Sequence, residues 1–239
     1  MRTLGHAHTE VWAATGWTRF KETAACRAAA TEPKKFIRSG SDDRLAEWLS
    51  KVRISRHPAE MSTVASVLLL PVGGPSREDL ENLASDLSAM GLRCSVDCAV
   101  PPPQGAYDRR RNQYLANALL GLAARPAHAL ADPRARVLAV TEADLYAGDL
   151  NFVFGIAQSR GRAAVISLCP LGFGADPPLR RERALKEAVH ELGHTLGLAH
   201  CSNAKCVMHF SNSLVDTDRK GSRLCAACER KTDARGIRA

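Results

Sequence analysis

The stretch HELGHTLGLAH, residues 190–200, decides how the rest of this sequence of 239 residues is interpreted. His190 and His194 are four residues apart, so an α-helix places both imidazoles on one face, one turn apart. That separation allows two histidines to bind one Zn²⁺ through nitrogen at about 2.0–2.1 Å. Gly197 can end the helix in a left-handed conformation, which turns the chain back so that His200 offers a third nitrogen. We therefore predict a three-histidine zinc site with an open fourth position, the pattern of a catalytic site.

Glu191 follows the first histidine directly, so its carboxylate can reach a zinc-bound water without occupying the metal. Zinc lowers the pKa of such a water from about 15.7 toward about 7 and polarises a carbonyl group. A neighbouring carboxylate can then take the proton and pass it to a leaving amine. The sequence thus predicts metal-assisted peptide hydrolysis. One alternative is a buried helix with incidental histidines, since Leu185, Val189 and Leu192 belong to an ordinary apolar stripe. The other is a zinc-stabilised peptide-binding or interaction protein with little catalysis, which would not need Glu191.

Four cysteines near the C-terminus form two close pairs, Cys201 with Cys206 and Cys225 with Cys228. Their spacing predicts a closed, tetrahedral four-thiolate zinc site within residues 201–228. Such a site would tie the loop after the histidines to the C-terminal segment, which has few apolar residues to order it by burial. Two disulfides, or thiols that bind nothing, are the alternatives. The remaining cysteines form no set and are predicted to be core thiols; they are Cys26, Cys94, Cys98 and Cys169.

Outward from these motifs, residues 61–239 alternate between strand-like and helical stretches, which is typical of an α/β layered domain. The predicted strands lie at residues 64–70, 93–100, 135–141, 152–157 and 163–168. Ser76 and Asp108 are predicted to cap two helices, and Pro177-Pro178 is predicted to lie in the loop before the zinc helix. Residues 1–60 lack sustained periodicity, so we expect a weakly structured extension, with Met61 as an alternative start of translation.

These motifs resemble those of a known family. HELGHTLGLAH is similar to the extended zinc motif of the metzincins, and Met208 lies where the methionine of their Met-turn belongs. The combination of Cys201-x4-Cys206-x-Met208 with Cys225-x2-Cys228 is narrower and resembles the archaemetzincins, a family of zinc metallopeptidases. The resemblance covers about residues 62–230 of the sequence.

The resemblance implies a metzincin-like zincin domain of the α/β (α+β) class. It would have a mixed, mostly parallel sheet, an antiparallel edge strand at 152–157, an active-site helix and a small zinc-bound C-terminal subdomain. An extended peptide could add to that edge as a further strand.

The resemblance also implies two Zn²⁺ ions per chain. The catalytic zinc would be held by His190, His194 and His200, with Glu191 as general base. Met208 would form a hydrophobic floor beneath that metal without binding it. The structural zinc would be held by the four clustered cysteines, Cys201, Cys206, Cys225 and Cys228.

Composition limits the partners. The 33 basic and 25 acidic residues give a formal charge of +8, but the excess is dispersed, which is typical of a solvated surface rather than of nucleic-acid binding. The most apolar stretch, residues 64–72, is far shorter than the roughly 20 residues of a membrane span. We find no secretory signal and expect a reducing compartment, so the prediction is a cytoplasmic enzyme acting on peptides or proteins, without nucleic-acid or membrane partners. Endopeptidases and aminopeptidases share this chemistry, and the sequence does not separate them.

Overall fold

The computed structural model describes residues 66–233, so the predicted extension at residues 1–60 and the alternative start at Met61 lie outside the described residues. Strands and helices alternate along the chain, as the sequence predicts. The elements are β1 (Ser66–Val72), α3 (Arg77–Ala89), β2 (Arg93–Val96), β3 (Tyr107–Asp108), β4 (Gln113–Leu115), α4 (Ala116–Ala129), β5 (Arg136–Thr141), β6 (Leu145–Tyr146), β7 (Gly155–Ala157), β8 (Ala163–Ser167), the 3₁₀ turn η1 (Pro170–Gly172), α5 (Pro177–Thr195), α6 (Leu214–Arg219) and α7 (Ala226–Asp233).

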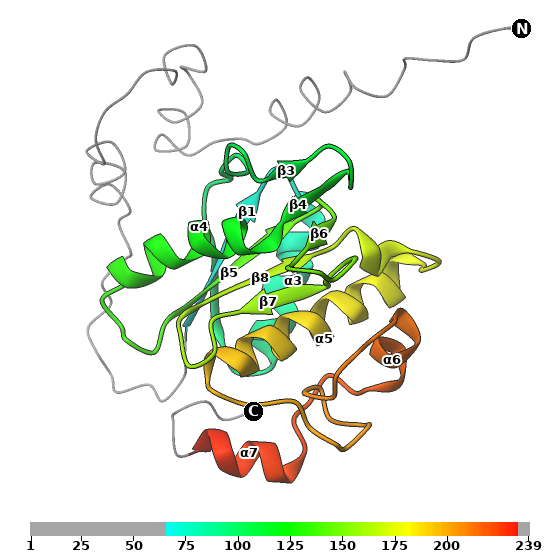
Figure 1. Cartoon of the computed structure of the whole chain (residues 1–239). Coiled ribbons are helices and arrows are strands. Elements are labelled where there is room, and N and C mark those ends of the chain that lie inside the picture. The colour runs from blue at the N-terminus through cyan, green and yellow to red at the C-terminus, as the bar shows by residue number, and fades with distance from the viewer. Residues whose placement is uncertain (1–65, 234–239) are drawn as a thin grey trace, which may run out of the picture. The chain divides into compact units, whose positions relative to one another are not determined.

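The main sheet has five strands in the order β2-β1-β5-β8-β7 (Figure 1). Strands β2, β1, β5 and β8 pair in parallel, and β7 pairs antiparallel with β8 at the edge. All five residues of β8 are buried, because helices cover both faces of a mostly parallel sheet. The predicted mixed, mostly parallel sheet with an antiparallel edge strand is confirmed.

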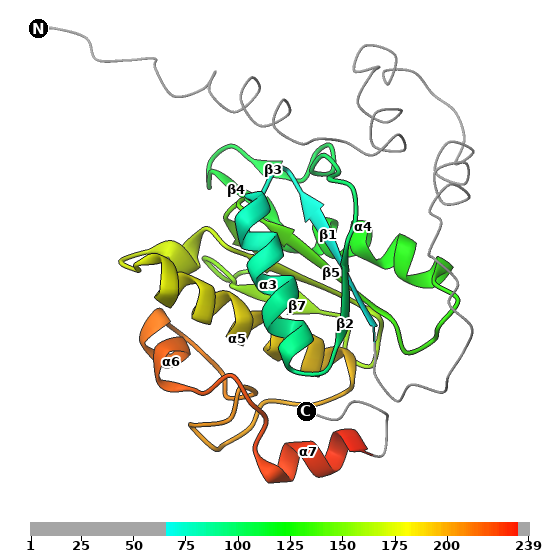
Figure 2. The ribbon, with the colours of Figure 1, turned by 180° about the vertical axis from the view of Figure 1, so that it is seen from behind.

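Helices lie on both faces of the sheet (Figures 1 and 2). On one face, Leu83 of α3 and Ala188 of α5 pack against Ile166 in one apolar cluster. On the other face, Leu119 of α4 packs in a second cluster with Val165, which precedes Ile166 on β8 and so faces the opposite side. These contacts fix helix α5, which carries the predicted zinc motif, beside the edge strand.

Strand β2 is shorter than predicted, because it ends at Val96 rather than at residue 100. The N–H of Asp97 still donates to β1, but the N–H of Cys98 donates to the Asp97 side chain at 2.8 Å. A side chain that captures a backbone donor interrupts the ladder. Pairing returns as a single bridge at Val100.

The predicted helix start at Asp108 is wrong. Residues 107–115 instead form strands β3 and β4, which join β6 in a separate three-stranded sheet, and α4 begins at Ala116. Oδ1 of Asp108 accepts hydrogen bonds from the backbone N–H groups of Arg110 and Arg111, at 2.8 and 3.2 Å. Asp108 therefore caps a turn, which Asn112 completes in a left-handed conformation with φ of 56°.

Pro177 and Pro178 were predicted to lie in a loop but form the first turn of α5. Asp176 caps the helix by accepting a hydrogen bond from the N–H of Leu179 at 2.9 Å. Prolines are well accommodated in a first turn, because its N–H groups have no partner within the helix.

The prediction of core thiols is only partly correct. Cys94 is half-buried and free, and burial raises the pKa of its thiol to about 11. Cys98 is disulfide-bonded, and Cys169 is exposed, because it precedes η1 on the surface. Cys26 lies outside the described residues.

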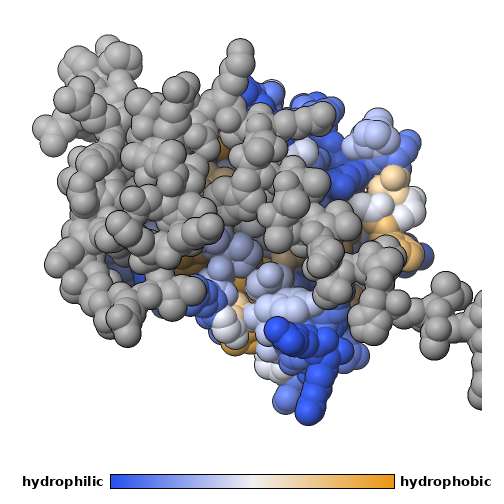
Figure 3. Space-filling model, turned by 90° about the horizontal axis from the view of Figure 1, so that it is seen from above, coloured by the Kyte–Doolittle hydropathy of each residue, from blue (hydrophilic) through white to orange (hydrophobic). Residues whose placement is uncertain are grey.

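Seen from above, hydrophilic residues dominate the visible described surface, with small hydrophobic patches between them (Figure 3). None of the described helices is long and apolar enough to cross a membrane.

Candidate active site

Helix α5 brings His190 and His194 together on one face. Each Nδ1–H donates to a backbone carbonyl at 2.8 Å, that of Val207 for His190 and that of Leu198 for His194. With Nδ1 protonated, each Nε2 keeps its lone pair, and the two Nε2 atoms lie 3.1 Å apart. Tetrahedral zinc with nitrogen bonds of 2.0–2.1 Å would place its ligands about 3.3 Å apart, so this pair fits one ion.

Gly197 turns the chain back toward the helix, as the sequence predicts, with φ of 83°. The turn brings His200 to the other two histidines, with ring centroids 5.4 Å from His190 and 4.9 Å from His194. One ligand nitrogen from each of the three can be chosen so that all lie within 4.8 Å of one another. His190 is buried and His200 is exposed, so the site faces solvent on one side.

The environment of His190 and His200 favours neutral imidazoles, the form that binds metal. Burial lowers the pKa of His190 to about 3, and the positive charge of Lys220 acts in the same direction. Burial also lowers the pKa of His200, as do the charges of His194 and Lys220.

Glu191 is buried next to this cluster, with 5% of its surface exposed. Burial raises the pKa of its carboxyl well above the usual range, and the carboxylate of Glu187 raises it further, whereas Lys220 opposes the shift. Its Oε2 has no hydrogen-bond partner among residues 66–233. An unpartnered buried carboxyl beside three clustered imidazoles fits a site that holds a divalent cation, because the cation would favour the ionised form.

The edge strand passes directly over Glu191. A Cβ atom at Gly155 would lie 2.7 Å from Cγ of Glu191 and 2.6 Å from the carbonyl oxygen of Val165. Only glycine therefore permits this approach between β7 and the carboxyl-bearing side chain.

Met208 packs against the same helix at Gly193. It is fully buried, in an apolar cluster with Leu198 and Val207. A Cβ atom at Gly193 would meet the Met208 sulfur. The motif glycine between the two helical histidines thus makes room for the methionine.

The structure also brings together the four clustered cysteines. Their sulfur atoms lie within 4.8 Å of one another, and Sγ of Cys201 is 3.8 Å from Sγ of Cys225. Tetrahedral zinc with sulfur bonds of about 2.3 Å would separate its thiolates by about 3.8 Å. All four are free thiols, so the disulfide alternative is wrong.

Backbone donors surround these sulfur atoms. The N–H of Cys225 donates to Sγ of Cys206 at 3.3 Å, and a donor from Cys228 lowers the pKa of Cys225 to about 6. Burial raises the pKa of Cys206 and of Cys228. A cation bound between the thiols of Cys206 and Cys228 would offset the cost of burial and allow both to ionise, which fits a metal site.

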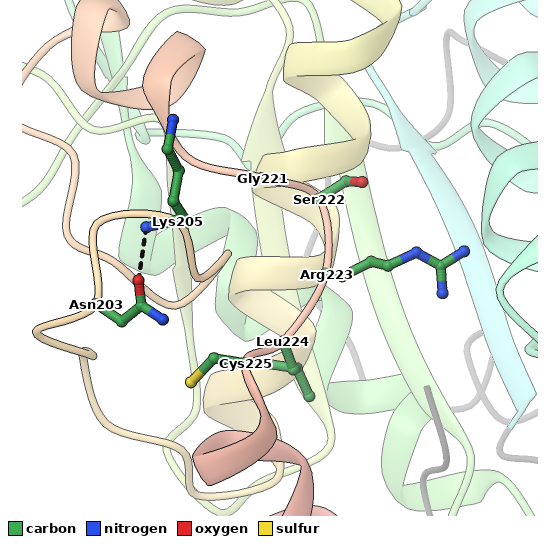
Figure 4. Close-up of a pocket in the computed structure, with 7 residues that line it drawn as sticks. All are labelled: Asn203, Lys205, Gly221, Ser222, Arg223, Leu224 and Cys225. Carbon is green, nitrogen blue, oxygen red and sulfur yellow. Dashed lines mark hydrogen bonds between the residues drawn. The ribbon is translucent and has the colours of Figure 1, made fainter.

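A pocket borders this cluster (Figure 4). Sγ of Cys225 points toward the loop of Asn203 and Lys205, whereas Arg223 points to the opposite side. Asn203 Oδ1 accepts a hydrogen bond from the backbone N–H of Lys205 at 3.0 Å, which holds that loop in shape. The cysteine cluster therefore joins the loop after the histidines to the start of α7.

Three residues at the site were not given a role from the sequence. Glu187 shares the helical face of His190 and Glu191, so helical spacing alone could have identified it. Gly155 and Lys220 come from distant parts of the chain, and no local pattern marks them.

Comparison with known proteins identifies the family to which the chain is similar. Residues 90–234 match the sequence profile of peptidase family M54. Over 183 residues, the chain is 44% identical to the archaemetzincin of Pyrococcus furiosus. This alignment covers 71% of this chain and 93% of the relative. The crystal structure of archaemetzincin from Archaeoglobus fulgidus complexed with malonate shows 39% identity and a TM-score of 0.61, covering 70% of this chain and 99% of that one. The crystal structure of a zinc-dependent peptidase from Methanocorpusculum labreanum shows 28% identity and a TM-score of 0.57, covering 70% and 98%.

The contact between Gly193 and Met208 gives a testable prediction. Alanine is ordinarily a better helix former than glycine, but Gly193→Ala would push Cβ into the Met208 sulfur. We expect a loss of about 1–3 kcal/mol in the free energy of unfolding, measured with urea. The control is Gly121→Ala in α4, where an added Cβ meets nothing within 4 Å. It should raise stability by about 0.5–1 kcal/mol, and equal effects of the two substitutions would contradict the packing role of Gly193.

Proposed function

The chain belongs to peptidase family M54 and is a zinc metallopeptidase; from this premise we propose that it hydrolyses peptide bonds with Glu191 as general base. The observation that carries the proposal is the buried, unpartnered carboxyl of Glu191 beside the three clustered histidines. When bound, zinc supplies Lewis acidity, which polarises the scissile carbonyl and makes water acidic enough to lose a proton near neutral pH.

Two zinc ions per chain are part of the proposal. His190, His194 and His200 would hold the catalytic ion and leave one position open to solvent and substrate. The four cysteines at 201, 206, 225 and 228 would hold the structural ion in a closed site. We place both within one peptidase domain of residues 61–239, with the second site at residues 201–228.

Glu191 would act on the proton of the attacking water. Its carboxylate oxygen takes that proton and delivers it to the nitrogen of the leaving amine. The buried position keeps competing water away from the carboxylate, and the neighbouring strand at Gly155 limits its movement. A general base works best when its pKa lies near the working pH, and burial moves the pKa of Glu191 upward in that direction.

The edge of β7 would bind the substrate. Among the described residues, β7 pairs only with β8, so its other edge can receive an extended peptide through main-chain hydrogen bonds. A peptide on that edge would lie beside Glu191, because Gly155 contacts that side chain. Phe210 is half-exposed and its ring lies 4.8 Å from that of His200, so it would contact a substrate side chain near the cleaved bond.

The cellular compartment is also a proposal. Six free thiols, at Cys94, Cys169 and the four clustered positions, fit a reducing environment such as the cytoplasm, and the disulfide at Cys98 is the exception among the described cysteines.

The proposed role of Glu191 is tested with a mixed peptide library. Zinc-loaded wild type and Glu191→Gln are purified identically, and cleavage products are identified by mass spectrometry. We expect equal zinc contents and a fall in turnover of about 10²–10⁴-fold in the variant, the usual contribution of a general base. The cut positions in the wild-type digest separate terminal trimming from internal cleavage.

Two other results of this experiment would change the conclusion. Unchanged turnover in Glu191→Gln would refute its assignment as base. If wild type cuts no peptide while both zinc sites are filled, the peptide-binding alternative is favoured.

The two proposed metals are tested separately by His194→Ala and Cys228→Ser. The first variant should lose one zinc and keep the other, because the four sulfur atoms do not depend on His194. The second variant should lose the structural zinc. It should also bind the catalytic zinc about 10–100-fold more weakly, because the carbonyl of Val207 orients His190 and lies in the cysteine-bound loop. Metal analysis and zinc titration measure both effects. Catalytic-zinc affinity unaltered by Cys228→Ser would show that the loop holds its shape without the second ion.

A further inference from the structure

A buried ion pair joins the active-site helix α5, one turn before Glu191, to Lys220 at the end of α6. Nζ of Lys220 is 2.9 Å from Oε1 of Glu187, and the two side chains are 0% and 4% exposed. The hydroxyl of Thr217 donates to the same Oε1 at 3.3 Å. Glu187 precedes His190 by three residues and Glu191 by four, so it shares their face of α5.

Lys220 ends a stretch of chain that returns along α5 after Met208. We call residues 209–220 the return segment; it includes α6, which lies beside the N-terminal half of α5 in both ribbon views (Figures 1 and 2). Its start is fixed by the packing of Met208 against Gly193. Its far end is fixed by the Lys220–Glu187 pair.

A second ion pair supports the same end of the return segment. Asp218 accepts two hydrogen bonds of 2.7 Å from the Arg183 guanidinium, which also donates to the carbonyls of Leu171 and Phe173. Arg183 lies two turns before Glu191, farther from the reacting groups than Glu187 does.

Between its two fixed ends, the return segment carries Phe210. This ring is half-exposed and lies 4.8 Å from that of His200, on the solvent side of the proposed zinc site. On one side of Phe210, His209 is held to the carbonyl of Cys201 at 2.9 Å. On its other side, the position of the ring depends on how the segment is attached to α5.

A contribution to the stability of the fold does not by itself explain a buried ion pair at this position. Burying two charges is costly, and apolar side chains of similar volume often stabilise a fold as well or better. What a buried pair can supply is one defined geometry, because other arrangements leave a charge without its partner.

We propose that Lys220 and Glu187 are a positioning pair for the peptidase reaction, which fixes the return segment and its Phe210 against the active-site helix. This inference rests on the proposed peptidase function and adds to it two residues that determine substrate binding. Neither residue touches the reacting atoms. Their charges also act on the pKa of Glu191. The proposed further effect reaches the substrate through the placement of the return segment.

The test uses the full-length, zinc-loaded protein with the double substitution Glu187→Gln/Lys220→Met. This variant removes both charges at nearly constant volume, so neither member of the pair is left as a lone buried charge. The control is Leu119→Ala in α4, a cavity on the opposite face of the sheet, which lowers stability without touching α5 or the return segment. Zinc content, melting temperature, kcat, KM and amide hydrogen exchange are measured for all three proteins, with a peptide that the wild type cleaves.

We expect the double variant to keep both zinc ions and to have a KM about fivefold or more above that of the wild type. Amide exchange in residues 214–219 should become about tenfold faster, whereas the amides of α5 stay protected. Leu119→Ala should lower the melting temperature but leave KM and exchange in residues 214–219 unchanged. If KM is unchanged in the double variant, or if the control raises KM equally, the pair is only structural and the proposal is overturned.

A second set of variants decides the question if the double variant does not fold. Glu187→Asp draws the carboxylate back by one carbon, and adding Lys220→Arg extends the cation toward it. A positioning pair predicts that Glu187→Asp alone raises KM and that Glu187→Asp/Lys220→Arg lowers it again; no recovery would overturn the proposal. If the wild type cleaves nothing, the proposed function fails, and amide exchange alone then shows whether the pair holds the segment.

Discussion

The hydrogen bonds from His190 and His194 to two backbone carbonyls are the interactions on which the rest of the site depends. They fix the tautomer and direction of each ring, so both Nε2 atoms face one point. Both carbonyls belong to the chain that follows α5, at Leu198 and Val207. The helix supplies the imidazoles, but the loop after the helix orients them. A helix with the same motif and a differently placed loop would not form this site.

This dependence links the histidine and cysteine clusters. Val207 lies between Cys206, one of the clustered thiols, and Met208, which packs against Gly193. A closed four-thiolate site would therefore hold the loop that orients His190, although it stands apart from the chemistry. The C-terminal segment has few apolar residues of its own, and metal binding can supply folding free energy where burial cannot. The second cluster thus has a physical reason to lie next to the first.

The sequence predicted those features that depend on local spacing. The histidine face of α5 and the left-handed Gly197 each follow from residues a few positions apart, and the grouping of the cysteines follows from two such close pairs. Residues 107–115 were misread because an aspartate caps a turn as readily as a helix, and the choice depends on pairing with β6. The Lys220–Glu187 pair joins positions 33 residues apart, and a lysine in a polar stretch carries no sign that it will be buried. Burial of charge is decided by tertiary structure, which a single sequence does not display.

The edge strand combines two requirements that usually conflict. A free strand edge invites pairing with other chains, so natural sheets keep such edges short or cover them. Here β7 has three residues, long enough for a few main-chain hydrogen bonds but too short to form a stable pairing surface alone. The same strand has no side chain at Gly155, so its backbone can approach both Val165 and Glu191. A peptide held on this edge is then placed beside the carboxyl group by the backbone, whatever its sequence. Discrimination between substrates must come from side chains around the edge, among which Phe210, carried by the return segment, lies next to the proposed zinc ligands.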